Sequence, residues 1–202
     1  MMWLAVAGEV CLVIALGLGA WRCGRLRSEA RTPIWSLLLT GALAFIAINA
    51  AVGALRYAGV TEVIPVHMQL TAVSVSWMMP LYLAAALRVW GKLPGSVWGL
   101  WLVLALLPAL SAISAALPGQ PPAVPGLLRD ALLVLALLRL IQQAPARLSL
   151  TLALALLLAV PLSNLLPLPA DAALGLFHLL LAGHFYAFYR AVPVFSAPRL
   201  VS

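Results

Sequence analysis

Ionisable and amide side chains interrupt the apolar stretches of this chain at matching depths. Glu9, Asn49, Asp130 and His178 each lie about six to nine residues from one end of such a stretch, or ~10 Å along a helix. Buried ionisable groups need partners or a neutral protonation state. We therefore expect the four side chains to meet and to transfer protons, with Glu9 and Asp130 as candidate catalytic acids or bases.

The stretch DAALGLFHLLLAGHFYAFYR, from Asp171 to Arg190, concentrates this chemistry. Asp171 and His178 are seven residues apart, which places them on one helical face, two turns from each other. His184 follows His178 by six residues, so it lies ~120° round the helix and ~9 Å further along. We expect His178 to belong to the polar site and His184 to have a separate, structural role.

Two further apolar stretches carry polar residues at the spacing i, i+4, i+7, which is one face of a helix. The residues are His67, Thr71 and Ser74 in one stretch and Asn49, Gly53 and Arg56 in the other. We expect these faces to line the same cavity as Glu9 and His178, together with Arg129 and Asn164, which lie near the corresponding ends of their stretches.

A metal site assembled between helices is one chemistry that such residues could support. His178, His67 and Asp171 are the tentative ligands, because zinc accepts N and O donors and leaves a position for water. Metal-bound water is a nucleophile near neutral pH, and Glu9 or Asp130 would act as its base. Haem ligation by His67 and His178 is an alternative.

Several known sites are excluded. The chain has no GxSG, HExxH or CxxC motif and no phosphate-binding glycine loop. Its single lysine, Lys92, lies in a predicted loop, whereas a retinal Schiff base needs a buried lysine amine. A working rhodopsin is therefore excluded.

Each polar residue also has a structural interpretation. Pairs of Glu9 with Arg56 and of Asp130 with Arg129 would neutralise charge between helices, and His178 could be a hydrogen-bond donor between helices. The same acids and histidines could alternatively form a proton or ion path, or an interface with a neighbouring subunit. These alternatives remain open at the level of the sequence.

The elements that carry these residues are predicted to be transmembrane helices. Of the 202 residues, 65% are hydrophobic and 8% are charged, whereas soluble domains have about 25% charged residues. Stretches long enough to cross a membrane are expected at about 2–20, 35–58, 65–87, 96–117, 124–141, 148–166 and 171–191. The sequence therefore predicts an all-α, single-domain, polytopic membrane protein with seven helices.

The basic residues predict the orientation, since cytoplasmic loops are enriched in Lys and Arg. With the N-terminus outside, the cytoplasmic residues would be Arg22, Arg25, Arg27, Arg31, Arg88, Lys92, Arg139, Arg147, Arg190 and Arg199. Only Arg56 and Arg129 would lie toward the other side. We expect an N-out, C-in protein of a bacterial inner membrane, whose net charge of +7 contacts anionic lipid rather than nucleic acid.

Seven helices in this orientation, with an acid early in the first and a histidine in the last, resemble the superfamily of alkaline ceramidases, PAQR receptors and related bacterial membrane proteins. The segment LFHLLLAGHFYAFYR is most similar to their last helix. Family hydrolases use three histidines, an aspartate and a serine around zinc to cleave lipid amides, so the resemblance implies such an activity and a zinc ligand at His178. The chain departs from the family's HxxxH, because five residues separate His178 from His184, and from its SxxxH in the second helix.

The function expected from these observations is a polar intramembrane cavity in the outer half of the bundle that binds or hydrolyses a lipid-like ester or amide. Transport of ions or small molecules and a non-enzymatic role in a membrane complex are the alternatives. Protein partners and the oligomeric state are left open.

Overall fold

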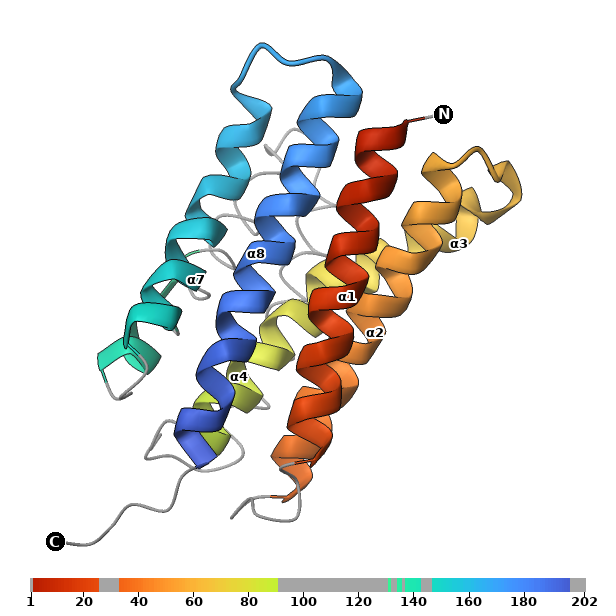
Figure 1. The fold of residues 1–202 in the computed structure, drawn as a ribbon. Coiled ribbons are helices and arrows are strands. Elements are labelled where there is room, and N and C mark those ends of the chain that lie inside the picture. Colours follow the sequence, from red (N-terminus) through yellow and green to blue (C-terminus); the bar gives the residue numbers. More distant parts are fainter. Residues whose placement is uncertain are drawn as a thin grey trace, which may run out of the picture.

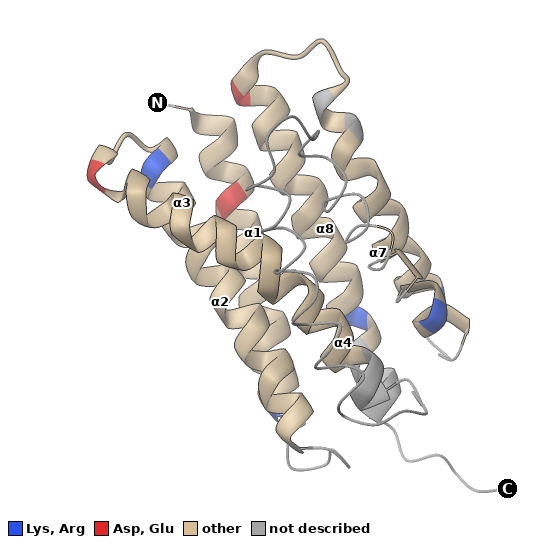
Figure 2. Ribbon diagram, turned by 180° about the vertical axis from the view of Figure 1, so that it is seen from behind, with Lys and Arg blue, Asp and Glu red and all other residues tan. Residues whose placement is uncertain are grey.

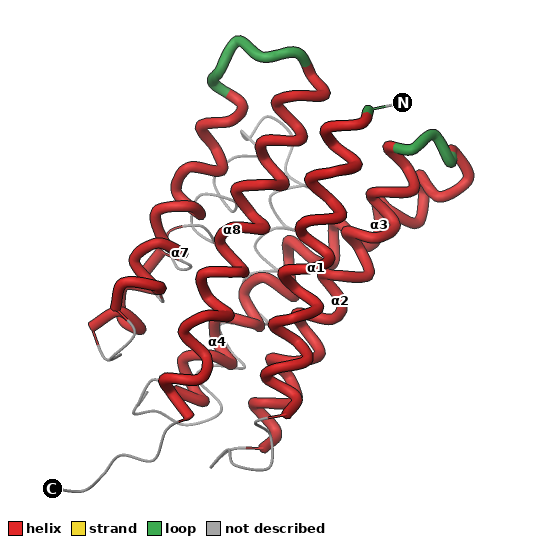
Figure 3. Tube along the Cα trace, in the orientation of Figure 1, coloured by secondary structure: helices red, strands yellow, loops and turns green. Residues whose placement is uncertain are grey.

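The computed structural model describes residues 2–25, 33–90, 131, 134–135, 137–142 and 147–196. Every regular element in these residues is helical (Figure 3), which confirms the all-α class for this part of the chain. The elements are α1 (Trp3–Arg25), α2 (Pro33–Tyr57), η2 (Thr61–Val63), α3 (Ile64–Val73), η3 (Ser74–Met78), α4 (Met79–Trp90), α7 (Arg147–Ala159), η4 (Val160–Asn164) and α8 (Ala170–Ser196).

Three of the described helices are long and apolar enough to cross a membrane, namely α1, α2 over Ile34–Tyr57 and α8 over Ala170–Ala191. They coincide with the predicted spans 2–20, 35–58 and 171–191. The predicted span 65–87 corresponds to α3, η3 and α4, and the span 148–166 corresponds to α7 and η4. The span 124–141 is described only in part, and the span 96–117 lies outside the described residues.

Helices α7, α8, α1 and α2 lie side by side in that order, and α4 crosses behind them (Figure 1). The core between these layers is aromatic and aliphatic. Tyr82 of α4 packs against Phe185 and Phe188 of α8, with ring centroids 5.2 and 5.3 Å apart. Large apolar side chains such as Ile14 and Leu179 point outward and are exposed, as expected for helices that face lipid.

The turn after α2 brings α3 back beside it. Gly59 has a φ of 105°, and the amides of Gly59 and Val60 donate to the carbonyls of Arg56 and Leu55 at 3.1 and 3.0 Å. This is a Schellman motif, which needs a left-handed residue after the helix and therefore favours glycine. The motif places the last turn of α2 opposite the first turns of α3.

Two prolines inside the predicted spans lie in or near irregular helical segments. Pro80 lies two residues after η3, whose bonds are of the π type, and Pro161 lies in η4, which is a 3-10 segment. A proline removes one backbone donor, and neighbouring geometry adjusts around it. Pro108 lies outside the described residues.

Acidic residues lie toward one end of the described helices and most of the basic residues toward the other (Figure 2). Arg56, in the last turn of α2, is a basic residue at the acidic end. Arg22 and Arg25 lie in the last turn of α1, and Arg147 begins α7. Glu9 and Asp171 lie near the opposite end, where α1 and α8 begin.

Candidate functional site

The beginning of α1 packs against the beginning of α8 at glycines. A Cβ atom added at Gly8 would lie 2.8 Å from the Gly175 carbonyl oxygen and 2.8 Å from the Cβ of His178. A Cβ added at Gly175 would lie 2.7 Å from the carbonyl oxygen of Leu4. Both distances are shorter than van der Waals contact, so the two helices approach this closely only because neither glycine has a side chain.

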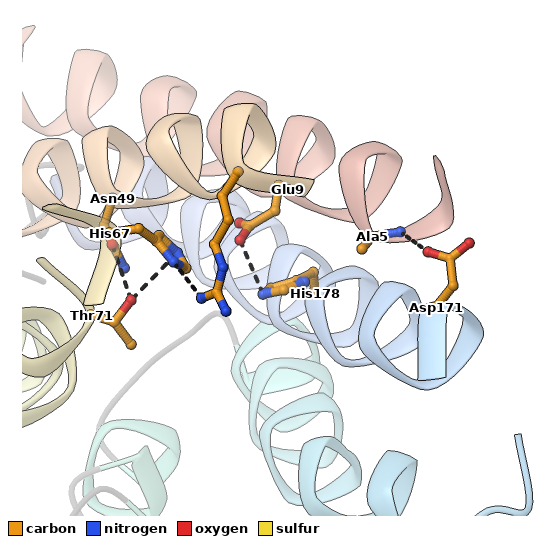
Figure 4. A network of polar contacts seen from close by, with 8 residues as sticks. Ala5, Glu9, Asn49, His67, Thr71, Asp171 and His178 are labelled. Atoms are coloured by element: carbon orange, nitrogen blue, oxygen red, sulfur yellow. Dashed lines mark hydrogen bonds and ion pairs between the residues drawn. The ribbon is translucent and has the colours of Figure 1, made fainter. Parts of the chain in front are cut away.

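This approach brings Glu9 and His178 together. Glu9 Oε1 lies 3.2 Å from His178 Nε2, and the two residues are only 2% and 8% exposed. Figure 4 shows the carboxyl group of α1 pointing at the imidazole of α8. A carboxyl group and an imidazole that share one exchangeable proton are either an ion pair, carboxylate and imidazolium, or two neutral groups, carboxylic acid and imidazole. The pair therefore remains electrically neutral in either arrangement, which suits a buried position.

The second nitrogen of His178 has no hydrogen-bond partner among the described residues. The carbonyl of Leu174, one turn earlier in α8, lies close enough to act on the ring without meeting the geometry of a hydrogen bond. A buried polar atom without a partner is costly in folded proteins and calls for an explanation. At His178 Nδ1, proton transfer to a bound molecule is such an explanation.

A second set of polar contacts joins α2 to α3. Arg56 Nη1 lies 3.0 Å from His67 Nδ1, Thr71 Oγ1 lies 3.4 Å from His67 Nε2, and Thr71 Oγ1 donates to Asn49 Oδ1 at 3.2 Å. The guanidinium has only donors, so His67 Nδ1 must accept, and the imidazole is neutral with its proton on Nε2. Each residue therefore donates a hydrogen bond to the next, from Arg56 through His67 and Thr71 to Asn49. Figure 4 shows these contacts.

Gly53 and Tyr57 connect the two sets into one cluster. A Cβ added at Gly53 would collide with the carboxylate of Glu9 and would lie 2.9 Å from His67 Nε2. The ring centroid of Tyr57 lies 6.0 Å from those of both His67 and His178. We call Glu9, Arg56, Tyr57, His67 and His178 the polar cluster.

Asp171, which was a tentative metal ligand in the sequence analysis, contacts the backbone of α1. Its carboxylate accepts the backbone amides of Ala5 at 2.9 Å and Leu4 at 3.3 Å, as Figure 4 shows for Ala5. These amides belong to the first turn of α1, whose unpaired donors favour a negative charge. Asp171 therefore caps α1 from α8, two turns away from His178.

These contacts bear on the expected zinc site. His67 presents its lone pair to Arg56, and both oxygens of Asp171 face the amides of α1. Within the described part of the chain there is no group of three or more His, Cys, Asp or Glu side chains that could hold a metal ion. The described donors therefore do not fit zinc.

The structure describes only some of the other residues predicted to line the cavity. Ser74 is 3% exposed and its Oγ has no partner among the described residues. Asn164 is the last residue of η4. Asp130 and Arg129 lie outside the described residues.

Glu9 and Arg56, which were an alternative ion pair, have other partners in the structure. Glu9 contacts His178, and Arg56 contacts His67.

His184 belongs to a separate contact. Its Nδ1 lies 2.8 Å from the Ala153 carbonyl oxygen and its Nε2 meets the hydroxyl of Tyr82. The carbonyl can only accept, so Nδ1 donates and Nε2 accepts from the hydroxyl. Both nitrogens are used, and the residue is fully buried. His184 joins α7, α8 and α4 and does not reach the polar cluster.

Sequence reasoning found four of the five cluster residues and missed Tyr57. The position of Tyr57 beside Arg56 at the end of a predicted span was the available signal. Gly8 was also missed, because its contact with Gly175 joins two helices that are far apart in the sequence. Comparison with protein-family models, curated proteins and solved structures finds no match to this chain. The resemblance to the ceramidase superfamily stays a prediction.

Proposed function

We propose that this chain is an integral membrane enzyme whose polar cluster binds the head of a lipid-like molecule and transfers a proton to or from it through Glu9 and His178. The observation that carries the proposal is the buried contact of 3.2 Å between the two side chains. Ionisable residues inside apolar helices are expensive, and they are retained mainly where they act on a substrate, a proton or an ion.

The chemistry follows from the two nitrogens of His178. In both neutral arrangements of the pair Nδ1 carries a hydrogen, so Nδ1–H can donate a proton to the leaving alcohol or amine of an ester or amide. The oxygen of a water molecule bonds to the carbonyl carbon as the bond to the leaving group breaks, and the proton that this water releases returns to Nδ1. Arg56 would stabilise the negative charge that develops, and Glu9 would hold the imidazole and its positive charge.

The positions of three arginines support the proposed orientation of the protein in the membrane. Because Arg22, Arg25 and Arg147 lie at the end remote from the cluster, the positive-inside rule would place that end in the cytoplasm. The cluster would then open to the outer leaflet of a bacterial inner membrane. Helices over 96–117 and 124–141 would complete a seven-helix bundle of the kind found in the ceramidase superfamily.

Conversion of ester and amide amphiphiles by the protein purified into lipid nanodiscs tests the proposal. Glu9→Gln and His178→Gln should each lower the rate by about 10²–10⁴, the usual contribution of general acid–base catalysis. Arg22→Gln, at the other end of α1, is the matched control and should keep full activity. Unchanged rates in Glu9→Gln, or no conversion of any such amphiphile by the wild type, would contradict the proposal.

Proton-coupled transport is the second candidate, favoured by the same pair, since one proton can move between Glu9 and His178 without a change in net charge. Proteoliposomes loaded with a pH-sensitive dye would distinguish the two. Transport requires a proton flux that disappears in Glu9→Gln, whereas the enzyme requires substrate turnover without such a flux.

A further inference from the structure

We infer that Arg56 recognises an anionic group, a carboxylate or a phosphate monoester, on the head of the amphiphile that binds at the polar cluster. The inference rests on the proposed function for the location of the ligand. It adds the chemical class of the head group and the residue that selects it.

The charge of Arg56 is not neutralised within the described residues. Its guanidinium has five N–H donors and stays protonated, and its hydrogen bond goes to the neutral imidazole of His67 at 3.0 Å. The nearby carboxylate, Glu9, pairs with His178 instead. A positive group beside a buried neutral pair leaves the described part of the cluster with one uncompensated positive charge, which a bound anion would neutralise.

Neighbouring side chains hold the guanidinium of Arg56 in position before a ligand binds. Arg56 is half-buried in the last turn of α2, and its Cζ lies 5.4 Å from the centroid of the Tyr57 ring. His67 is in turn fixed by Thr71 and Asn49, so side chains of two helices orient the arginine. A preorganised guanidinium pairs with carboxylate or phosphate through two parallel hydrogen bonds, and partial burial strengthens the pairing.

Arg22 offers a matched comparison in the same chain. Its Cζ lies 5.1 Å from the ring centroid of Tyr189, and its Nη1 donates to the Tyr189 hydroxyl at 3.0 Å. Each of the two arginines thus has a tyrosine neighbour and a side-chain hydrogen bond. Each lies in the last turn of its helix, and because α1 and α2 run in opposite directions the two arginines lie at opposite ends of this helix pair (Figure 1). Only Arg56 adjoins a buried acid and histidine pair, so only Arg56 should respond to an amphiphilic anion.

Calorimetric titration of the full-length protein in dodecyl maltoside tests this. Dodecanoate and dodecyl phosphate are the charged probes, dodecanol is the uncharged one, and acetate and inorganic phosphate lack the chain. We expect the preferred charged probe to bind at least about tenfold more tightly than dodecanol, and Arg56→Gln to weaken its binding about 10- to 100-fold, as for a lost hydrogen bond to a charged group. Arg22→Gln should bind like the wild type.

Several outcomes would overturn the inference. Equal binding of dodecanol and both charged probes removes the charge selection, and equal binding of inorganic phosphate and dodecyl phosphate removes the lipid. Anion binding that appears only in Asp130→Asn would mean that the chain supplies its own counter-ion to Arg56. If Arg56→Gln does not fold, Arg56→Lys keeps the charge without the paired hydrogen bonds, and undiminished affinity in that variant also contradicts the inference.

The inference and the proposed function can fail separately. Anion binding that depends on Arg56, with no conversion of any amphiphile, would refute the enzyme and keep the binding site. Conversion of uncharged esters that depends on Glu9 and is unaffected by Arg56→Gln would refute the charge selection and keep the enzyme.

Discussion

Alanine at position 8 should destabilise the protein, although alanine usually stabilises a helix relative to glycine. The new Cβ would lie 2.8 Å from both the Gly175 oxygen and the Cβ of His178, whereas contacts of this kind settle near 3.4–4 Å. Helices α1 and α8 must therefore move apart by about 0.6–1.2 Å. The contact between Glu9 and His178 would lengthen from 3.2 Å to about 4 Å, which is beyond a hydrogen bond.

The magnitude follows from three opposing contributions. Overpacking costs about 1–3 kcal/mol, and loss of a buried hydrogen bond to a charged group costs about 1.5–3 kcal/mol. The better helix propensity of alanine returns about 1 kcal/mol. We expect Gly8→Ala to lower the free energy of unfolding by about 1.5–5 kcal/mol and to reduce the turnover that depends on Glu9.

Gly17→Ala is the matched control, because no atom of the described residues lies within 4 Å of a Cβ added at this exposed position of the same helix. It should leave the unfolding free energy unchanged or raise it by up to about 1 kcal/mol. Unfolding in mixed micelles, followed by tryptophan fluorescence, measures both variants. Equal behaviour of Gly8→Ala and Gly17→Ala would refute the argument that the two helices meet at glycine.

Three further substitutions test other contacts. Gly53→Ala should displace the Glu9 carboxylate, with which the new Cβ would collide, and lower turnover at least about tenfold. Gly41→Ala in the same helix should not, because its new Cβ meets no atom of the described residues within 4 Å. Equal kinetics of the two variants would contradict the cluster. Asp171→Ala should cost about 0.5–2 kcal/mol and speed hydrogen exchange of the first amides of α1, and unchanged exchange would refute the cap. Tyr82→Phe should lower the unfolding free energy by about 1–3 kcal/mol, because it leaves a buried nitrogen unpaired, without changing turnover measured below the unfolding transition; a loss of turnover there would link that contact to the site.

Depth and helical face were enough to predict which residues belong together. Glu9 and His178 lie at similar distances from the ends of their spans, and the structure brings them into contact. The stripe of His67 and Thr71 likewise meets the face that carries Asn49. These predictions succeeded because a helix has a fixed rise and period, so position along the sequence gives position along and around the axis.

The partner of each residue could not be predicted in the same way. A pair of Glu9 with Arg56 was an open alternative to the shared site with His178, and the structure pairs Glu9 with His178, because the glycines let α1 and α8 approach closely at this point. Asp171 shares a face with His178 as expected, but its carboxylate meets backbone amides of α1. Pairing depends on distances between helix axes and on where neighbouring helices begin, and neither is encoded in the periodicity of one segment.

The two histidines of α8 show how hydrogen-bond accounting separates structure from function. His184 is fully buried with both nitrogens engaged, by Tyr82 and by the Ala153 carbonyl, and a satisfied network of this kind stabilises one packing arrangement. His178 pairs one nitrogen with an acid, and its other nitrogen has no partner in the part of the chain that the structure describes. A protein that needed only stability would replace that second arrangement with apolar packing at little cost. This nitrogen therefore supports the proposal that the glycine contact between α1 and α8 holds an acid and a base together for a bound molecule.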